Sequence, residues 1–308
     1  MNQNYIDTVR LLLAIAPAVF ASGRFAMKGG TALNLFVQEM PRLSVDIDLV
    51  FVDHLLDRQA ALQAIAKELA AVQAALARKG YRAHLPANAD GDDVKLVVSN
   101  DAAQVKVEVN FVFRGTALPV ETRSLVTTAQ HLFTTDLTVP VLATAELYGS
   151  KLVAAMDRQH PRDIFDVMHM LDYFGWQPSF IDCFVVYLAG HNRPVHEVLF
   201  PKTKPLEPAF TNEFAGMTRD TIELDTLAQT QARLLKELPQ QLTHAHRGFL
   251  LSLVQGDPAW ELMPMPHLRE LPAIKWKLMN LAKLKKSSAK RFATQHQLLA
   301  DRFGQVGD

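Results

Sequence analysis

The sequence has little cysteine, no excess of charge of either sign and, at its start, an apolar run too short to span a bilayer. Its 308 residues include one cysteine, Cys183, which excludes an internal disulfide and a cysteine-based zinc cluster. Lysine plus arginine balances aspartate plus glutamate at 32 each, so only a local patch could bind nucleic acid. The apolar run at 11–20 is short and follows an acidic residue, so we expect an amphipathic helix there, no membrane partner and a cytoplasmic protein.

Several common signatures of catalysis are also missing. The chain has no Walker A loop, no dinucleotide-binding G-x-G-x-x-G and no G-x-S-x-G nucleophile motif. Its eleven histidines form no set with the spacing of metal ligands. The chemistry must therefore be sought among other residue types.

The distribution of strand and helix patterns predicts two lobes. Up to about residue 140 the two patterns alternate, with strands expected over 24–28, 43–52, 94–99 and 104–113 and helices over 31–40 and 54–79. Later residues have helical periods, beginning at 143–159 and 161–174, with proline-rich breaks at 193–208 and 258–272. We predict an α/β (α+β) protein, with a small mixed sheet flanked by helices in 1–140 and a mostly helical lobe in 141–308.

The expected strand over 43–52 carries two aspartates two residues apart. Side chains two apart on a strand share a face, so Asp46 and Asp48 project together while the alternate apolar residues face a core. Adjacent carboxylates repel each other, and Mg²⁺ relieves this by binding through one or two carboxylates plus substrate phosphates. A bare Asp-x-Asp is more often a solvated strand face, so its context decides.

That context is a glycine turn at the start of a helix, formed by Lys28, Gly29, Gly30 and Thr31. Backbone N–H groups at a helix N-terminus bind phosphate, and the Thr31 hydroxyl is expected to donate to the same phosphate. Alone, such a turn is an ordinary helix cap. Followed by Asp46-x-Asp48, it indicates a nucleoside triphosphate site.

Three neighbouring residues are candidates for the same site. Arg42 is expected either to hold a phosphate or to form a surface salt bridge, and Ser44 either to orient the aspartates or to cap the turn. Within the strand over 104–113, Val105, Val107 and Val109 share one face and Glu108 lies on the other. Glu108 is therefore a candidate third metal ligand, or else a solvent-facing strand residue.

The chain resembles the nucleotidyltransferase-like toxins of the AbiEii/AbiGii family, within the DNA polymerase β-like superfamily. The resemblance lies in MKGGTALNLF, RLSVDIDLVF, VKVEVNFVF, AELYGSKLVAAMDRQHPRDIFDVMHML, RGFLLSL and LPAIKWKLMNLAKL, which cover most of the chain in order. One departure is that the usual Gly-Ser of the superfamily is Gly-Thr here, with 14 residues between Thr31 and Asp46.

The resemblance implies an NTP-dependent nucleotidyltransferase. It implies that Lys151 contacts the triphosphate and that Asp163 is a further active-site acid, with Asp166 one turn later as the alternative. The simpler alternatives are a surface lysine and a helix-capping acid. Asp46, Asp48 and Glu108 are then expected to hold two Mg²⁺ ions that clamp the attacking and leaving oxygens.

The resemblance also implies a toxin of a type IV-like toxin–antitoxin or phage-defence system. We expect a cognate antitoxin protein as partner and transfer of a nucleoside monophosphate to a tRNA acceptor end. A basic tail at 275–291 suits a nucleic-acid backbone, or is a solvated helix end. Its cations are Lys275, Lys277, Lys283, Lys285, Lys286, Lys290 and Arg291. Two alternatives stay open: an enzyme that transfers a nucleotide or phosphate to a hydroxyl of a partner protein, and an inactive nucleotide-binding module.

Overall fold

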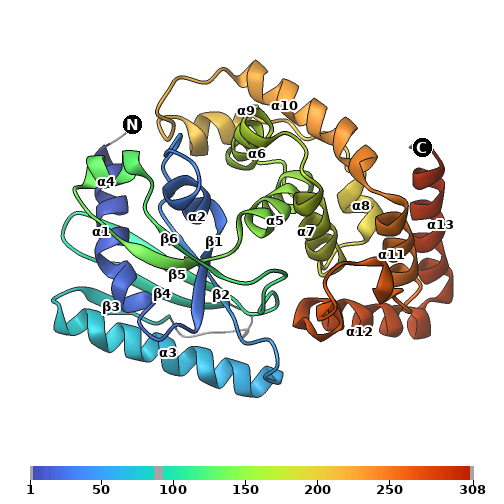
Figure 1. Cartoon of the computed structure of the whole chain (residues 1–308), viewed down its shortest axis with the longest axis horizontal. Coiled ribbons are helices and arrows are strands. Elements are labelled where there is room, and N and C mark those ends of the chain that lie inside the picture. The colour runs from blue at the N-terminus through green and yellow to red at the C-terminus, as the bar shows by residue number, and fades with distance from the viewer. Residues whose placement is uncertain (1–2, 87–92, 306–308) are drawn as a thin grey trace. The chain divides into compact units, whose positions relative to one another are not determined.

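A computed structural model describes residues 3–86 and 93–305 of the chain (Figure 1). The chain divides into two compact units. We call them the N-terminal unit, Met1–Leu147 with Ala215–Thr221, and the C-terminal unit, Tyr148–Phe214 with Ile222–Asp308. Within the described residues all the strands belong to the N-terminal unit, and the C-terminal unit is built from helices.

The N-terminal unit is built on a seven-stranded mixed sheet with the order β3-β4-β5-β2-β1-β7-β6. The strands are β1 (Phe25–Lys28), β2 (Ile47–Phe51), β3 (Arg82–His84), β4 (Asp93–Ser99), β5 (Gln104–Asn110), β6 (Glu121–Ser124) and β7 (Thr138–Val141). Strand β2 pairs in parallel with β5, and β1 in parallel with β7, while the other neighbours are antiparallel. The strand that follows Asp46 is thus the middle strand of the sheet.

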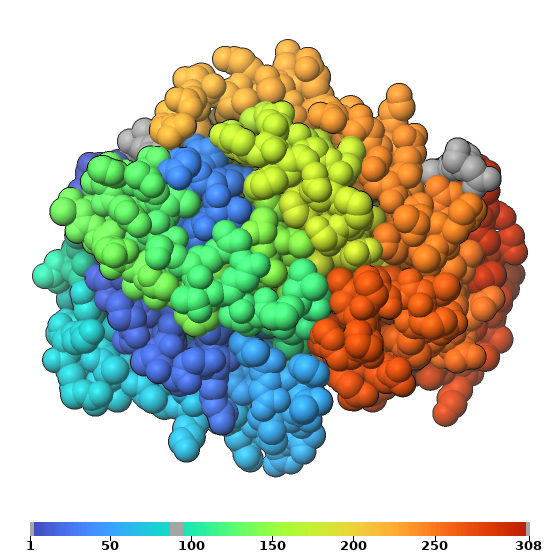
Figure 2. Space-filling view, viewed as in Figure 1, coloured from blue at the N-terminus to red at the C-terminus, as the bar shows by residue number. Residues whose placement is uncertain are grey.

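Helices α1 (Gln3–Val19) and α3 (Arg58–Arg78) pack against each other and against the strands β3 to β5. Helix α3 is long and apolar enough, by length and composition alone, to cross a membrane. It buries one stripe at helical spacing, made of Ala61, Ile65, Leu69, Val72 and Leu76. Side chains of its other face lie on the surface of the N-terminal unit (Figure 2). This one-sided burial is typical of a helix that packs on a sheet.

The region around the Asp-x-Asp motif differs from the expected secondary structure. Helix α2 covers Gly29–Phe36, so it begins and ends earlier than the expected 31–40. The strand expected over 43–52 is confined to β2, because residues before it pair with the returning segment 215–221. Leu43 N–H donates to the carbonyl oxygen of Met217 at 2.8 Å, and Arg219 N–H to that of Pro41 at 2.9 Å. Asp46 therefore lies just before the strand rather than within it.

Two short elements were not expected from the sequence. Strand β3 forms one edge of the sheet, where it pairs antiparallel with β4. Helix α4 (Thr127–Phe133) lies between β6 and β7, where no helix was predicted. Both elements are shorter than the windows over which hydrophobic periodicity can be recognised.

The C-terminal unit contains nine α-helices within the described residues, one of which, α5, begins in the N-terminal unit. They are α5 (Thr144–Asp157), α6 (Pro161–Phe174), α7 (Pro178–Ala189), α8 (Val195–Leu199), α9 (Glu207–Ala209), α10 (Leu224–Glu237), α11 (His244–Val254), α12 (Pro272–Ser287) and α13 (Ala289–Gln305). Proline stands in the first turn of α6, α7 and α12, where its missing N–H costs no helical hydrogen bond. An aromatic cluster of Tyr148, Phe174 and Phe180 packs α5 against α6 and α7. Cys183 is a buried free thiol.

The expected basic tail is a pair of packed helices, α12 and α13. Lys277 is buried, and its Nζ donates to the carbonyl oxygens of His191 at 2.9 Å and Arg193 at 2.6 Å. Burial lowers the pKa of Lys277 to about 8. The expectation that Lys277 belongs to a solvated basic surface is therefore wrong. The other cations of the segment are exposed, and residues 271–300 contain no carboxylate.

Candidate active site

The turn between β1 and α2 is in close contact with side chains from the Asp-x-Asp region. Gly29 has a φ of +76°, and a Cβ built on it would lie 2.1 Å from Oδ2 of Asp48. A Cβ built on Gly30 would lie 2.7 Å from Nη2 of Arg42 and 2.9 Å from Oγ of Ser44. A larger residue at either position would therefore displace these side chains, and Gly29 is favoured for its backbone conformation as well. The Asp48 carboxylate lies directly against the N-terminus of α2.

Thr31 fixes the backbone next to this carboxylate. Its side chain is fully buried, and Oγ1 donates to the carbonyl oxygen of Asp46 at 2.5 Å. The sequence predicted that this hydroxyl donates to a phosphate, whereas in the structure it holds the chain segment that leads into β2. Asn34 anchors the same turn, because its Nδ2 donates to the carbonyl oxygen of Gly30 at 2.9 Å.

Arg42 is 2 % exposed, so the alternative of a surface salt bridge is wrong. Its Nη1 donates to the carbonyl oxygen of Leu43 at 2.9 Å, and the guanidinium group lies against Gly30. A buried arginine beside a helix N-terminus places a permanent positive charge at the candidate phosphate position. Its binding of phosphate stays a prediction.

Asp46 and Asp48 are both half-exposed, on either side of the buried Ile47. The strand register places Lys28 opposite Asp48 on β1 and Glu108 opposite Asp48 on β5. Lys95 lies opposite Glu108 on β4. We call these four residues the charged row: Lys28, Asp48, Glu108 and Lys95 cross four neighbouring strands on one face of the sheet.

Within the charged row, Glu108 is engaged by a cation. Its Oε1 lies 3.2 Å from Nζ of Lys95. In the described part of the chain no three His, Cys, Asp or Glu side chains are arranged to hold a metal ion. The structure therefore places Glu108 on the strand next to Asp48, but does not gather Asp46, Asp48 and Glu108 as a ready set of ligands.

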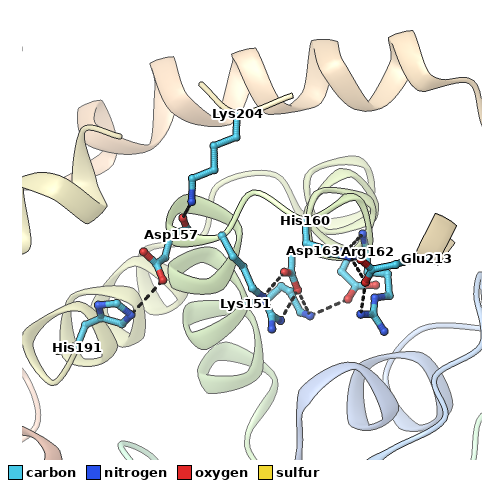
Figure 3. A network of polar contacts seen from close by, with 10 residues as sticks. Lys151, Asp157, His160, Arg162, Asp163, His191, Lys204 and Glu213 are labelled. Carbon is cyan, nitrogen blue, oxygen red and sulfur yellow. Dashed lines mark hydrogen bonds and ion pairs between the residues drawn. The ribbon is translucent and has the colours of Figure 1, made fainter. Parts of the chain in front are cut away.

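The second group of candidate residues lies in the C-terminal unit and is buried (Figure 3). Nζ of Lys151, on α5, lies 2.9 Å from Oδ1 of Asp163 and 2.9 Å from Oδ2 of Asp166, both on α6. Arg158 binds Asp163 through Nε at 2.6 Å and Nη2 at 3.0 Å. We call these four residues the lysine cluster. Lys151 is 6 % exposed, so the alternative of a surface lysine is wrong.

The electrostatics of the lysine cluster are those of two buried carboxylates balanced by two cations. Burial by itself raises the pKa of Asp163, but Lys151 and Arg158 hold it well below its ordinary value. Asp163 is therefore ionised at neutral pH. The cost of desolvation offsets most of the attraction in buried ion pairs, so such a cluster adds little to stability. Its burial and charge make it a candidate functional site.

Three residues were not among those predicted from the sequence: Arg158, which belongs to the lysine cluster, and His160 and Glu213, which lie beside it. His160 caps α6, because its Nδ1 accepts from the N–H of Arg162 at 3.1 Å. Its Nε2 therefore carries the proton and donates to Oε2 of Glu213, 3.1 Å away. Burial lowers the pKa of His160, so the ring is neutral at pH 7. The cap of α6 is thus His160, whereas the Asp163 carboxylate is bound by Lys151 and Arg158.

A mixed sheet with a glycine turn lying against the Asp48 carboxylate is the arrangement expected of a nucleotidyltransferase. The family model described as nucleotidyl transferase AbiEii toxin, Type IV TA system, matches residues 10–280. The chain therefore belongs to the AbiEii family of nucleotidyltransferase toxins of type IV toxin–antitoxin systems. Membership implies a nucleoside triphosphate substrate and an antitoxin as partner.

Among solved structures, the chain is similar to MenT4, a nucleotidyltransferase toxin from Mycobacterium tuberculosis H37Rv. The TM-score is 0.61 at 18 % sequence identity, and the match covers 91 % of this chain and 95 % of that one. At this identity the match supports the fold. A comparison with curated proteins found no match. The resemblance and the mixed α/β fold expected from the sequence are thus confirmed.

Proposed function

We propose that this toxin transfers a nucleoside monophosphate from a nucleoside triphosphate to the acceptor end of tRNA, in a Mg²⁺-dependent reaction. The observation that carries the proposal is the contact between the Asp48 carboxylate and the Gly29–Gly30 turn. It puts a carboxylate suited to a metal ion beside N–H groups suited to phosphate, as the triphosphate of a metal-bound nucleotide requires.

The residues present fit Mg²⁺. Asp46 and Asp48 supply two carboxylates, and Mg²⁺ commonly completes its shell with water and substrate phosphates. Glu108, on the neighbouring strand, is the proposed third ligand. To bind the metal, its carboxylate would leave its ion pair with Lys95. Bound Mg²⁺, in one or two ions, would neutralise charge on the attacking and leaving oxygens.

The cations around the turn are proposed to bind the triphosphate. Lys28 lies opposite Asp48 in the strand register, and the Arg42 guanidinium lies against Gly30. The acceptor hydroxyl oxygen forms a bond to the α-phosphorus, the bond between the α- and β-phosphates breaks, and pyrophosphate leaves. The hydroxyl proton passes to Asp46 or Glu108, and Ser44 orients the aspartates.

The lysine cluster is proposed to act in the same reaction, as the family resemblance implies. Lys151 would contact the triphosphate as a compact positive charge. Asp163 is ionised and held by two cations, so its proposed role is to position Lys151 rather than to accept a proton. Asp166 stays the alternative acid, because it lies equally close to Lys151.

The proposal that the acceptor is RNA is supported by the surface of α12 and α13. Five cations, Lys283, Lys285, Lys286, Lys290 and Arg291, are exposed there in a stretch without carboxylates. Nucleic acids are bound largely through phosphate charge, so such a surface suits RNA better than an average protein partner. An RNA acceptor and the family's toxin role would both place the protein in the cytoplasm.

The test is incubation of the purified protein with Mg²⁺, total tRNA and each α-³²P-labelled nucleoside triphosphate in turn. We expect label on RNA from at least one nucleotide, and its loss when the metal is chelated. Prior periodate oxidation of the tRNA, which destroys the terminal hydroxyls, is expected to abolish labelling if the acceptor end is used. Label on protein alone would contradict the tRNA proposal and favour the protein-modifying alternative.

A further inference from the structure

A groove with a cavity volume of about 470 Å³ lies in the C-terminal unit beside the loop 201–205. This Pro-Lys-Thr-Lys-Pro segment lies within the proline-rich break predicted at 193–208. We call the cavity the loop groove. Its polar lining is mainly basic: Lys202 and Lys204 come from the loop, Arg193 precedes α8, Arg302 lies on α13, and the His196 ring lies within α8. Glu197 is the carboxylate in the lining.

The backbone of the loop is held by two buried glutamines. Gln159 donates from Nε2 to the carbonyl oxygen of Lys202 at 2.8 Å and accepts at Oε1 from the N–H of Lys204 at 2.9 Å. Gln231 donates to the carbonyl oxygen of Lys204 at 3.0 Å and to Oε1 of Gln159 at 2.7 Å. Gln159 has a φ of +53°, which is uncommon for a residue other than glycine. These bonds hold the loop in one conformation.

The cations of the loop groove differ in how far they are already neutralised. Arg193 is bound to Asp157 and Glu197, so its charge is balanced. Lys202, Lys204 and Arg302 are exposed, and in the described residues none of them pairs with a carboxylate. Lys204 donates one N–H to the carbonyl oxygen of Asp157 at 2.7 Å, at the end of the helix that carries Lys151 (Figure 3). Two of its three N–H groups stay available.

The loop groove also has an apolar side. The Arg302 guanidinium lies over the Phe200 ring, 5.7 Å from its centroid, and Leu298 in the lining is 43 % exposed. Burial lowers the pKa of His196, so this ring adds no charge at pH 7. A sugar or base can rest on such a surface while phosphates meet the cations at the rim.

We propose that the loop groove binds backbone phosphates of the acceptor RNA through Lys202, Lys204 and Arg302. The inference rests on the proposed function, in which RNA is the acceptor. A long polyanion is favoured over a small free anion because the three cations are exposed and line an open groove, rather than converging from buried positions on one point. The fixed loop lowers the entropy lost on binding, because the two lysines start from a held backbone.

The test compares the double variant Lys202→Gln/Lys204→Gln with the double variant Lys67→Gln/Lys79→Gln. Lys67 and Lys79 are exposed on or next to α3, and replacing them changes the net charge by the same amount. Equilibrium binding of total tRNA by the full-length protein is measured over a series of salt concentrations. Each phosphate contact contributes about 0.7 to 0.9 to the slope of log K against log salt.

Two lost contacts are expected to reduce the slope by about 1.4 to 1.8 and to weaken binding by about 25- to 60-fold at 0.1 M salt. The control variant is expected to bind tRNA as the wild type does. Equal binding by both double variants would overturn the proposal. A second result would also overturn it: the loop variant binds tRNA normally, but inorganic phosphate no longer raises its melting temperature. The groove would then bind a small anion rather than RNA.

Two further measurements separate the possible failures. If the loop variant has a lower melting temperature than the wild type, the binding measurement is repeated with Arg302→Gln. Arg302 lies on α13, so this substitution leaves the loop itself unchanged. If the wild type labels tRNA and the loop variant binds tRNA normally, only the loop groove proposal fails. If the wild type neither binds nor labels tRNA, the proposed acceptor itself is wrong.

Discussion

Replacing Gly29 by alanine is predicted to abolish most transferase activity through a displacement of the Asp48 carboxylate. The added Cβ would lie 2.1 Å from Oδ2, and real Cβ contacts are almost never below 3.0 Å, so the carboxylate must retreat by about 0.9 Å. A misplacement of about 1 Å at a reacting centre can cost about 100-fold in rate. The left-handed backbone adds a stability cost of about 1–2 kcal/mol, because alanine tolerates it poorly.

Gly80→Ala is the matched control, because Gly80 has a φ of +84° with nothing within 4 Å of an added Cβ. Both variants are expected to lose similar stability in thermal or urea unfolding, by about 1–2 kcal/mol. Only Gly29→Ala is expected to lose kcat/KM in the nucleotide transfer assay, by about 100-fold. Equal activity of the two variants would refute the role given to the contact between Gly29 and Asp48.

Other substitutions test the remaining parts of the site. Thr31→Val removes the donor to the Asp46 carbonyl oxygen, so we expect the free energy of unfolding to fall by about 1–3 kcal/mol and nucleotide transfer to slow. Thr31→Ser keeps the donor, and its stability and transfer rate are expected to stay near wild type. Equal losses in the two variants would argue against this role of the hydrogen bond. Lys151→Met removes the cation that Asp163 and Asp166 share, so we expect the C-terminal unit to lose about 3–5 kcal/mol of stability in urea unfolding. Replacing an exposed lysine by methionine is expected to cost much less. Burial depresses the pKa of Lys277 from 10.5 to about 8. Between these two pH values the lysine is protonated in the unfolded chain but largely neutral in the folded one. The free energy of unfolding therefore rises with pH across this window. Lys277→Met is expected to lose this rise, of roughly 3 kcal/mol, in unfolding measured from pH 7 to 10.5, and an unchanged profile would contradict the assignment.

The centre of the N-terminal unit could be predicted from local sequence. Alternation in 105–110 and around Ile47 gave the two strands that carry Glu108 and Asp48, and the glycine pair identified the start of α2. These patterns are local, because the period of a strand and the conformation of a glycine turn are properties of neighbouring residues. The role of each site residue in catalysis stays a prediction.

Features that depend on distant residues were not predictable in the same way. The return of 215–221 to pair with 41–43 shortens the strand before Asp46, and no local pattern announces it. Lys277 reads as one more surface lysine, yet its partners are carbonyl oxygens more than 80 positions away. The loop 201–205 has the composition of a linker, and only the buried Gln159 and Gln231 fix it.

The most direct test of the central claim is the nucleotide transfer assay with Asp48→Asn and Asp101→Asn side by side. Both substitutions remove one negative charge and keep the size of the side chain, but Asp101 is an exposed partner of Arg82, 98 % accessible at its side chain. We predict that Asp48→Asn loses transfer of label while keeping the wild-type melting temperature, and that Asp101→Asn transfers normally. Normal transfer by Asp48→Asn would contradict the assignment of this carboxylate to the reaction.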